Sequence, residues 1–161
     1  MHPSTILFSL AASALTVSAS PVAPINPNKN VNLNTKRTCS VQYPELRTSP
    51  NQPIPYSIDI SSSQSVDVGF TMPDDITGPC SLMLSLPEQI SGSAQVNVVA
   101  LDGPAQGSLV GTTTFAAGSS ATINSFACRP QMCYQLQIAS GDGSVQFVES
   151  QGVGLTMTYD C

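Results

Sequence analysis

The side chains that most enzymes use for proton transfer are scarce in this chain of 161 residues. Its only histidine is His2, and its two lysines also lie within the first 36 residues. The rest of the chain therefore has no Ser-His-Asp, Cys-His or Ser-Lys arrangement and no imidazole metal site. The phosphate-binding patterns G-x-x-x-x-G-K-S/T and G-x-G-x-x-G do not occur either. The sequence predicts no catalytic residue, no metal site and no cofactor.

Paired carboxylates are the remaining catalytic option, because glycoside hydrolysis needs only two Asp or Glu side chains. We expect five acids on solvated strand faces: Glu45, Asp59, Asp67, Glu88 and Glu149. Four others lie in predicted turns, where Asp side chains hydrogen-bond the backbone: Asp74, Asp75, Asp102 and Asp142. None of these acids has the regular spacing of a calcium-binding loop. An exposed aromatic platform for sugar would have to use Tyr43 or Tyr56, and core packing is the expected role of Tyr56.

The elements that position these groups are predicted to be strands. Apolar residues alternate with polar ones from residue 54 onward, which places one row of side chains on a core and the other in water. Turn signals separate the apolar runs, among them Pro73-Asp74-Asp75, Asp102-Gly103-Pro104 and Gly141-Asp142-Gly143. No stretch shows helical periodicity. Eight or nine short strands at roughly ten-residue spacing predict a single antiparallel β-sandwich.

Five cysteines cannot all pair within one chain. Cys80 and Cys128 each share a strand face with apolar residues, so we expect both in the core, bridged to each other across the sandwich. Cys39 and Cys161 lie at the two ends of residues 38–161, and the termini of a sandwich often lie close together. We therefore expect another bridge between Cys39 and Cys161. Cys133 shares a face with glutamines, so it is expected as a solvent-exposed free thiol. The rival arrangement is a local Cys128–Cys133 bridge. Zinc coordination would need more thiols or imidazoles.

The first 37 residues have the pattern of a processed leader. Residues 6–17 form a short apolar run, and Val-Ser-Ala follows at 17–19, as in a signal peptide cut after Ala19. Residues 20–37 hold three Pro and five Asn and end in Lys36-Arg37. We interpret them as a disordered pro-segment ending in a dibasic protease site. A buried N-terminal element and a chance basic pair are the alternatives.

Charge narrows the expected partners of residues 38–161. Arg47 and Arg129 are the only basic residues there, against all ten Asp and Glu, for a formal charge of −8. Such a surface repels phosphate backbones and anionic lipid, so no nucleic acid and no membrane is expected as a partner. The predicted product is secreted and acts outside the cell or in the cell wall. We expect a monomer that binds an extracellular protein or a glycan, with Cys133 available to link two chains.

Three segments resemble the But-two C-terminal domain family of fungal proteins: CSLMLSLPEQISGSAQVNVVALDG at 80–103, INSFAC at 123–128 and GVGLTMTYDC at 152–161. The resemblance covers roughly residues 43–161. It implies a fungal, secreted, β-rich domain in a family without an established catalytic site. Cys39, Cys80, Cys128 and Cys161 form the more regular set in that pattern, and Cys133 is additional. The family takes its name from a member that binds an activating enzyme of a ubiquitin-like modifier, and that activity is not carried over to a chain with a signal peptide.

Two classes of function follow from these observations. The first is a secreted non-catalytic protein, acting at the fungal cell wall or as an effector toward a host or competitor. The second is an extracellular carbohydrate-binding module or acidic glycoside hydrolase. The first is favoured because the chain downstream of residue 37 has so few groups for catalysis.

Overall fold

The computed structural model describes residues 38–76 and 78–161. The expected signal peptide (1–19) and pro-segment (20–37) lie outside these residues, as do the processing residues Ala19, Lys36 and Arg37. The expected mature domain, 38–161, is thus described except for residue 77.

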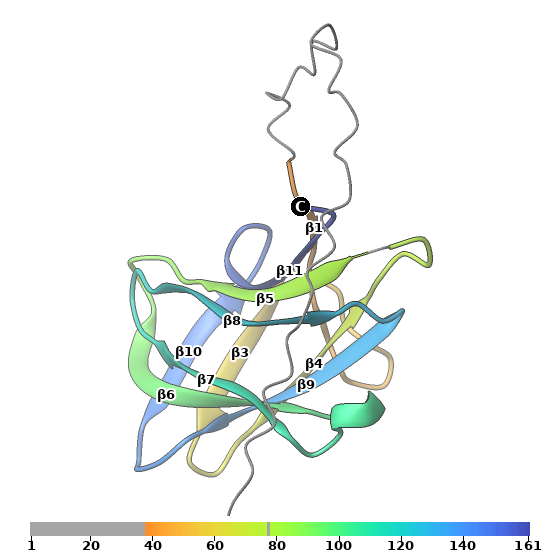
Figure 1. The fold of residues 1–161 in the computed structure, drawn as a ribbon. Helices are drawn as coiled ribbons and strands as arrows, with labels where there is room; N and C mark the ends of the chain where they lie inside the picture. The colour runs from red at the N-terminus through yellow and green to blue at the C-terminus, as the bar shows by residue number, and fades with distance from the viewer. Residues whose placement is uncertain (1–37, 77) are drawn as a thin grey trace, which may run out of the picture. The chain divides into compact units, whose positions relative to one another are not determined.

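Two antiparallel sheets face each other and enclose the core (Figure 1). The smaller sheet has the strand order β1-β11-β5-β8. Its strands are β1 (Ser40–Gln42), β11 (Gly154–Tyr159), β5 (Pro79–Ser85) and β8 (Ser120–Ala127). The larger sheet has the order β2-β4-β9-β6-β10-β3, and β7 also pairs with β6. Its strands are β2 (Glu45–Leu46), β4 (Val66–Thr71), β9 (Gln131–Ile138), β6 (Ser91–Ala100), β10 (Ser144–Glu149), β3 (Tyr56–Ser61) and β7 (Leu109–Phe115).

Strand β6 organises the larger sheet because three other strands pair with it. Its C-terminal part pairs with β9 on one ladder and with β7 on another. Its first three residues, 91–93, pair with β10. β9 and β10 are joined by residues 139–143 and both run antiparallel to β6, so they form one interrupted run along it. The break lets β10 continue to β3, while β9 pairs with β4.

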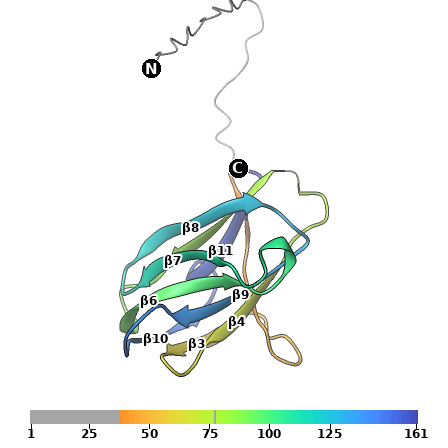
Figure 2. The ribbon, with the colours of Figure 1, turned by 60° about the horizontal axis from the view of Figure 1, so that its bottom comes forward.

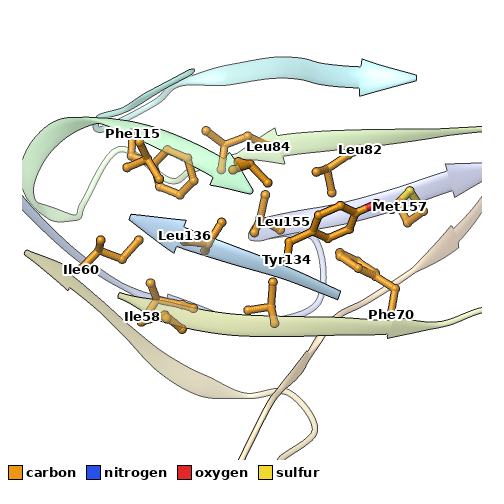
Figure 3. Close-up of a cluster of buried hydrophobic side chains, with 14 of the residues drawn as sticks. Ile58, Ile60, Phe70, Leu82, Leu84, Phe115, Tyr134, Leu136, Leu155 and Met157 are labelled. Carbon is orange, nitrogen blue, oxygen red and sulfur yellow. The ribbon is translucent and has the colours of Figure 1, made fainter. Parts of the chain in front are cut away.

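The core between the sheets follows the alternation in the sequence. In β10, Val145 and Phe147 are buried, whereas Ser144, Gln146 and Val148 are exposed. Equivalent side chains from both sheets meet in the middle of the domain, where Figure 3 shows Leu82, Leu84 and Leu155 of the smaller sheet facing residues of the larger one. The fully buried side chains are mostly aliphatic, and the chain has no tryptophan. Hydrophobic burial on one shared core therefore holds the two layers together.

The predicted antiparallel β-sandwich is confirmed, but it has eleven strands where eight or nine were expected. β1 and β2 have three and two residues, too short to show alternation. β7 and β8 have few buried side chains, so their sequences lack a regular apolar row. The described residues contain one helical turn, the 3-10 helix η1 (Gly103–Ala105). No helix among them is both long and apolar enough to cross a membrane.

Two disulfides close the smaller sheet. Cys39 is bonded to Cys161, with 4.3 Å between their Cα atoms, directly beyond the β1–β11 ladder that pairs Ser40 with Tyr159. Cys80 is bonded to Cys128, with 5.1 Å between their Cα atoms. This is the expected pairing, and the rival Cys128–Cys133 bridge is absent from the described residues.

The expected position of the second bridge was wrong. Cys80 lies on β5, which pairs with β8, and Cys128 directly follows β8. The bridge thus joins adjacent strands of one sheet and does not cross the sandwich. Strand parity placed both cysteines toward the core, but parity does not indicate which of the two sheets carries a strand.

The Cys39–Cys161 bridge should contribute strongly to stability, because it links two residues that are far apart in the sequence. It closes a loop with a sequence separation of 122 residues. Chain-entropy arguments give a loss of about 5 kcal/mol in unfolding free energy when such a loop is opened. We therefore predict that Cys39→Ser/Cys161→Ser lowers the stability of the domain by up to about 5 kcal/mol in urea unfolding.

A matched control is Ser40→Ala, which changes a neighbouring side chain and leaves the bridge intact. Non-reducing peptide mapping checks the connectivity independently. A peptide that links Cys128 to Cys133, or a double variant as stable as the parent, would contradict this account.

Candidate functional site

An apolar cleft opens where the two sheets end side by side. β7 is hydrogen-bonded to β6 of the larger sheet and β8 to β5 of the smaller sheet, so their hairpin passes from one layer to the other (Figure 2). At the end of the hairpin away from its turn, the side-chain amide of Asn124 donates to the carbonyl of Val110 at 2.7 Å. Gly111 lies so close to Ile123 that a Cβ there would collide with it. Val110 and Asn124 line the cleft together with Leu109 and Ala127.

The cleft has a volume of about 330 Å³ and an apolar lining. Its floor includes the buried side chains of Ala100, Met132 and Tyr134. Leu109 and Phe126 come from the two strand edges. Leu109 is 59% exposed, which is unusual for a leucine in a domain whose other apolar residues are mostly buried. The cleft thus offers apolar surface to solvent in the size range of small-molecule sites, roughly 300–1,000 Å³.

Arg129 lines the cleft and forms an ion pair with Asp102, which lies outside the lining. Nη2 of Arg129 donates to Oδ1 of Asp102 at 2.7 Å, and each side chain is about one-third exposed. The guanidinium lies against Gly103, where φ is +70° and a Cβ would leave it no room. Burial by itself would raise the pKa of Asp102. Arg129 and the hydrogen bonds from the thiol and backbone of Cys133 outweigh this effect, so the pKa of Asp102 is lowered from its usual value. The pair therefore stays charged and fixes the turn that begins η1.

Cys133 is buried, and the expectation of an exposed thiol was wrong. It is free but only 3% exposed. Parity did place it on the outer face of β9, but that face is covered there: Nη1 of Arg47 donates to its Sγ at 2.8 Å. The neighbouring strand carries Gly69 at the paired position, and a Cβ on Gly69 would collide with the Arg47 stem. The backbone of Leu101 also covers this part of β9, with its N–H bonded to the Cys133 carbonyl.

The Cys133 thiol is also electrostatically unreactive. Burial and the neighbouring Asp102 carboxylate raise its pKa to about 11, which outweighs the opposing influence of Arg47. The thiolate is the nucleophilic form, so a buried thiol with this pKa reacts slowly. The burial of Cys133 does not favour the expected Cys133-linked dimer, which stays a prediction.

Glu149 was expected on a solvated strand face and instead lies fully inside the core. It shares the inward parity of Val145 and Phe147, so the alternation along β10 already contained this signal. Its Oε2 accepts a hydrogen bond from the backbone N–H of Leu155 at 3.0 Å, while Oε1 has no partner among the described residues. The carboxyl lies against Gly154, whose φ of +99° and lack of a Cβ make room for it.

Burial raises the pKa of Glu149 to about 8, and the Leu155 N–H lowers it only in part. Its cross-strand neighbour on β3 is Tyr56, whose buried hydroxyl also lacks a partner among the described residues. Burial raises the pKa of Tyr56, and the charges of Glu149 and Glu45 raise it further. A carboxyl with a pKa near neutrality is typical of a general acid. This one, however, lies where no solvent-borne substrate can touch it.

Asp59 and Asp67 line the same groove on the larger sheet. Both are partly exposed, as expected for the solvated faces of β3 and β4, and the groove is shallow, with a volume of about 340 Å³. Oδ1 of Asp67 accepts from the side-chain amide of Gln135 at 3.0 Å. Arg47 lines the same groove.

The other acids stand apart from this groove. Glu45 is partly exposed on β2 and accepts a hydrogen bond from Asn51 at 3.3 Å, and Glu88 is exposed after β5. Asp74, Asp75 and Asp142 occupy turns or bends, as predicted. The described residues contain no group of three or more His, Cys, Asp or Glu that could hold a metal ion.

Neither tyrosine that was considered for sugar stacking forms an exposed platform. Tyr56 is 4% exposed and belongs to the core, as predicted, and Tyr43 is half-buried. The outer groove with Asp59 and Asp67 is lined by no aromatic residue. Sequence reasoning missed the apolar cleft, because Leu109, Phe126 and Met132 come from segments whose proximity only the sheet topology determines.

Comparison with known proteins adds no relative: no family model, no curated protein and no solved structure matches this chain.

The buried carboxyl makes a specific prediction about pH. The pKa of Glu149 is about 8 in the fold against an ordinary value of 4.5, so the folded state holds a proton that the unfolded chain has released between these pH values. Stability from this group is complete below pH 4.5 and is lost as the pH rises through 8. Glu149→Gln should abolish this slope. Relative to the variant, the parent should lose about 3 kcal/mol of unfolding free energy between pH 5 and pH 8.

Urea unfolding of parent and variant at both pH values measures this difference. Glu88→Gln removes an exposed carboxylate and serves as the matched control, because it should leave the slope unchanged. Equal slopes for the parent and Glu149→Gln would contradict the raised pKa of Glu149. They would mean that its carboxylate is already ionised in the folded state at pH 5.

Proposed function

We propose that this chain is a secreted, non-catalytic fungal protein that acts at the cell wall or as an effector-like extracellular protein. One observation carries the proposal: the two side chains with reactive potential, Glu149 and Cys133, are both buried. Side chains buried in this way are part of the packed interior and cannot contact a substrate. Their burial favours binding over catalysis as the activity of the protein.

Secretion is supported by the leader and by the two disulfides. Cys39–Cys161 and Cys80–Cys128 are structural bridges of a kind that persists in oxidising compartments. The leader pattern at residues 6–19 and the resemblance to the But-two C-terminal domain family favour the same compartment. The acidic surface of residues 38–161 favours a protein or glycan partner over nucleic acid or anionic membrane.

A second function is favoured by the groove that holds Asp59 and Asp67. Two carboxylates on one face, with amide side chains beside them, are suited to hydrogen-bonding the hydroxyls of a sugar. An acidic glycoside hydrolase also uses two carboxylates, and this groove is lined by two. This groove lacks the aromatic platform of most sugar-binding sites, so we place carbohydrate binding second.

N-terminal sequencing of the protein recovered from fungal culture medium tests the proposed processing. The expected first residue is Thr38, because cleavage after Ala19 and after Arg37 would remove both upstream segments. A start at Ser20 would retain secretion and exclude the pro-segment, and recovery only inside the cells would contradict the proposal.

A glycan array combined with a reducing-sugar assay separates the two functions. The non-catalytic proposal predicts no release of reducing sugar from wall polysaccharides. Asp59→Asn and Asp67→Asn are the informative variants, with exposed Asp142→Asn as the matched control. Hydrolysis that either groove variant abolishes and the control retains would establish the second function instead.

A further inference from the structure

The cleft between β7 and β8 exposes apolar side chains that have no partner in the described residues. Leu109 is 59% exposed, and the cleft behind it reaches Met132 and Tyr134, which belong to the core floor. Val110 and Asn124, which are hydrogen-bonded to each other, line the same cleft. Apolar surface that stays open in a disulfide-bonded domain is characteristic of a ligand site.

The polar group at the rim indicates which ligand chemistry fits. Nη2 of Arg129 is bonded to Asp102, but among the described residues Nε and Nη1 have no acceptor. An arginine has five N–H donors, so several remain to bind an oxygen of a ligand. The Asp102 carboxylate does not line the cleft and is bonded to Arg129 and Cys133. Arg129 therefore matches a head group that accepts hydrogen bonds.

Charge selects a neutral head group over an anionic one. Arg129 is already paired with the Asp102 carboxylate, so the local charge of the rim is balanced. The remainder of residues 38–161 adds a strongly negative field, since ten acids face only two arginines. A ligand carboxylate would meet the Asp102 charge at close range and that field at longer range. A neutral hydroxyl is repelled neither by Asp102 nor by the negative field of the domain.

From these three features we propose that the cleft binds an uncharged amphiphile, an aliphatic molecule with a neutral hydroxyl head group. The aliphatic part lies against Leu109, Phe126 and Met132, and the hydroxyl oxygen accepts a hydrogen bond from Arg129. The cavity of about 330 Å³ accommodates a chain of small-molecule size. This assignment does not depend on where the protein acts, so it stands or fails independently of the proposed cell-wall or effector function.

The test compares 1-octanol with octanoate, which share an aliphatic chain and differ in head-group charge. The full secreted protein, labelled for NMR, is titrated with each at pH 7.5. We expect 1-octanol to shift the methyl resonances of Leu109, Val110 and Met132 with a dissociation constant on the order of 0.1–1 mM. Octanoate should bind at least about fivefold more weakly, because of the like charges.

A variant that fills the cleft checks the location. Ala105 lines the cleft and is exposed, so Ala105→Trp should weaken 1-octanol binding about tenfold or more without disturbing the core. Ala117→Trp places the same side chain on an exposed residue of the β7–β8 turn and should leave binding unchanged. The methyl mapping on the parent protein remains decisive if the variant does not fold.

Three results would overturn the assignment. Octanoate binding as tightly as 1-octanol would mean that the rim selects an anion. Absence of shifts in the cleft methyls with either compound would mean that the cleft takes no amphiphile. Shifts of these methyls with protein concentration alone, accompanied by a dimer in sedimentation, would mean that a second copy of the chain covers the cleft.

Discussion

The packing of two sheets on one aliphatic core determines where every reactive group of this protein lies. Side chains alternate across a strand, so each residue of a central strand faces either the core or the outside. Glu149 follows this rule on β10 and enters the core, although burying a carboxyl is costly. Protonation is the way the fold accommodates it, since burial raises its pKa to about 8.

The edges of the sheets have a different organisation from the core. At one edge of the smaller sheet, the β1–β11 ladder is closed by the Cys39–Cys161 bridge. At the other edge, β8 lies beside β7 of the opposite sheet, and the Cys80–Cys128 bridge secures the end of β8. The apolar cleft opens beside that secured end. An open apolar cleft beside a strand end that a disulfide secures favours binding without large rearrangement.

The alternation in the sequence was sufficient to predict the sandwich and the central strands, because those strands bury one complete face. It was not sufficient for β7 and β8, whose edge positions leave few residues buried. Cys133 shows the limit of parity most clearly. Its outward direction was predicted correctly, but Arg47 from a distant segment covers it, and contacts between distant segments are not visible in a periodic pattern. For Glu149 the signal was present in the parity of β10, and the usual preference of carboxylates for solvent concealed it.

The account's central claim is that the potentially reactive side chains are sealed within the fold, and Cys133 provides the most direct test. The folded protein is exposed to 5,5′-dithiobis(2-nitrobenzoic acid) at pH 8, and the rate of its reaction is compared with the rate in denaturing urea. The account predicts one thiol per chain that reacts in urea and at least about 100-fold more slowly in the folded state, because Cys133 is buried and its pKa is raised. A folded-state rate equal to that of the unfolded chain would contradict the claim.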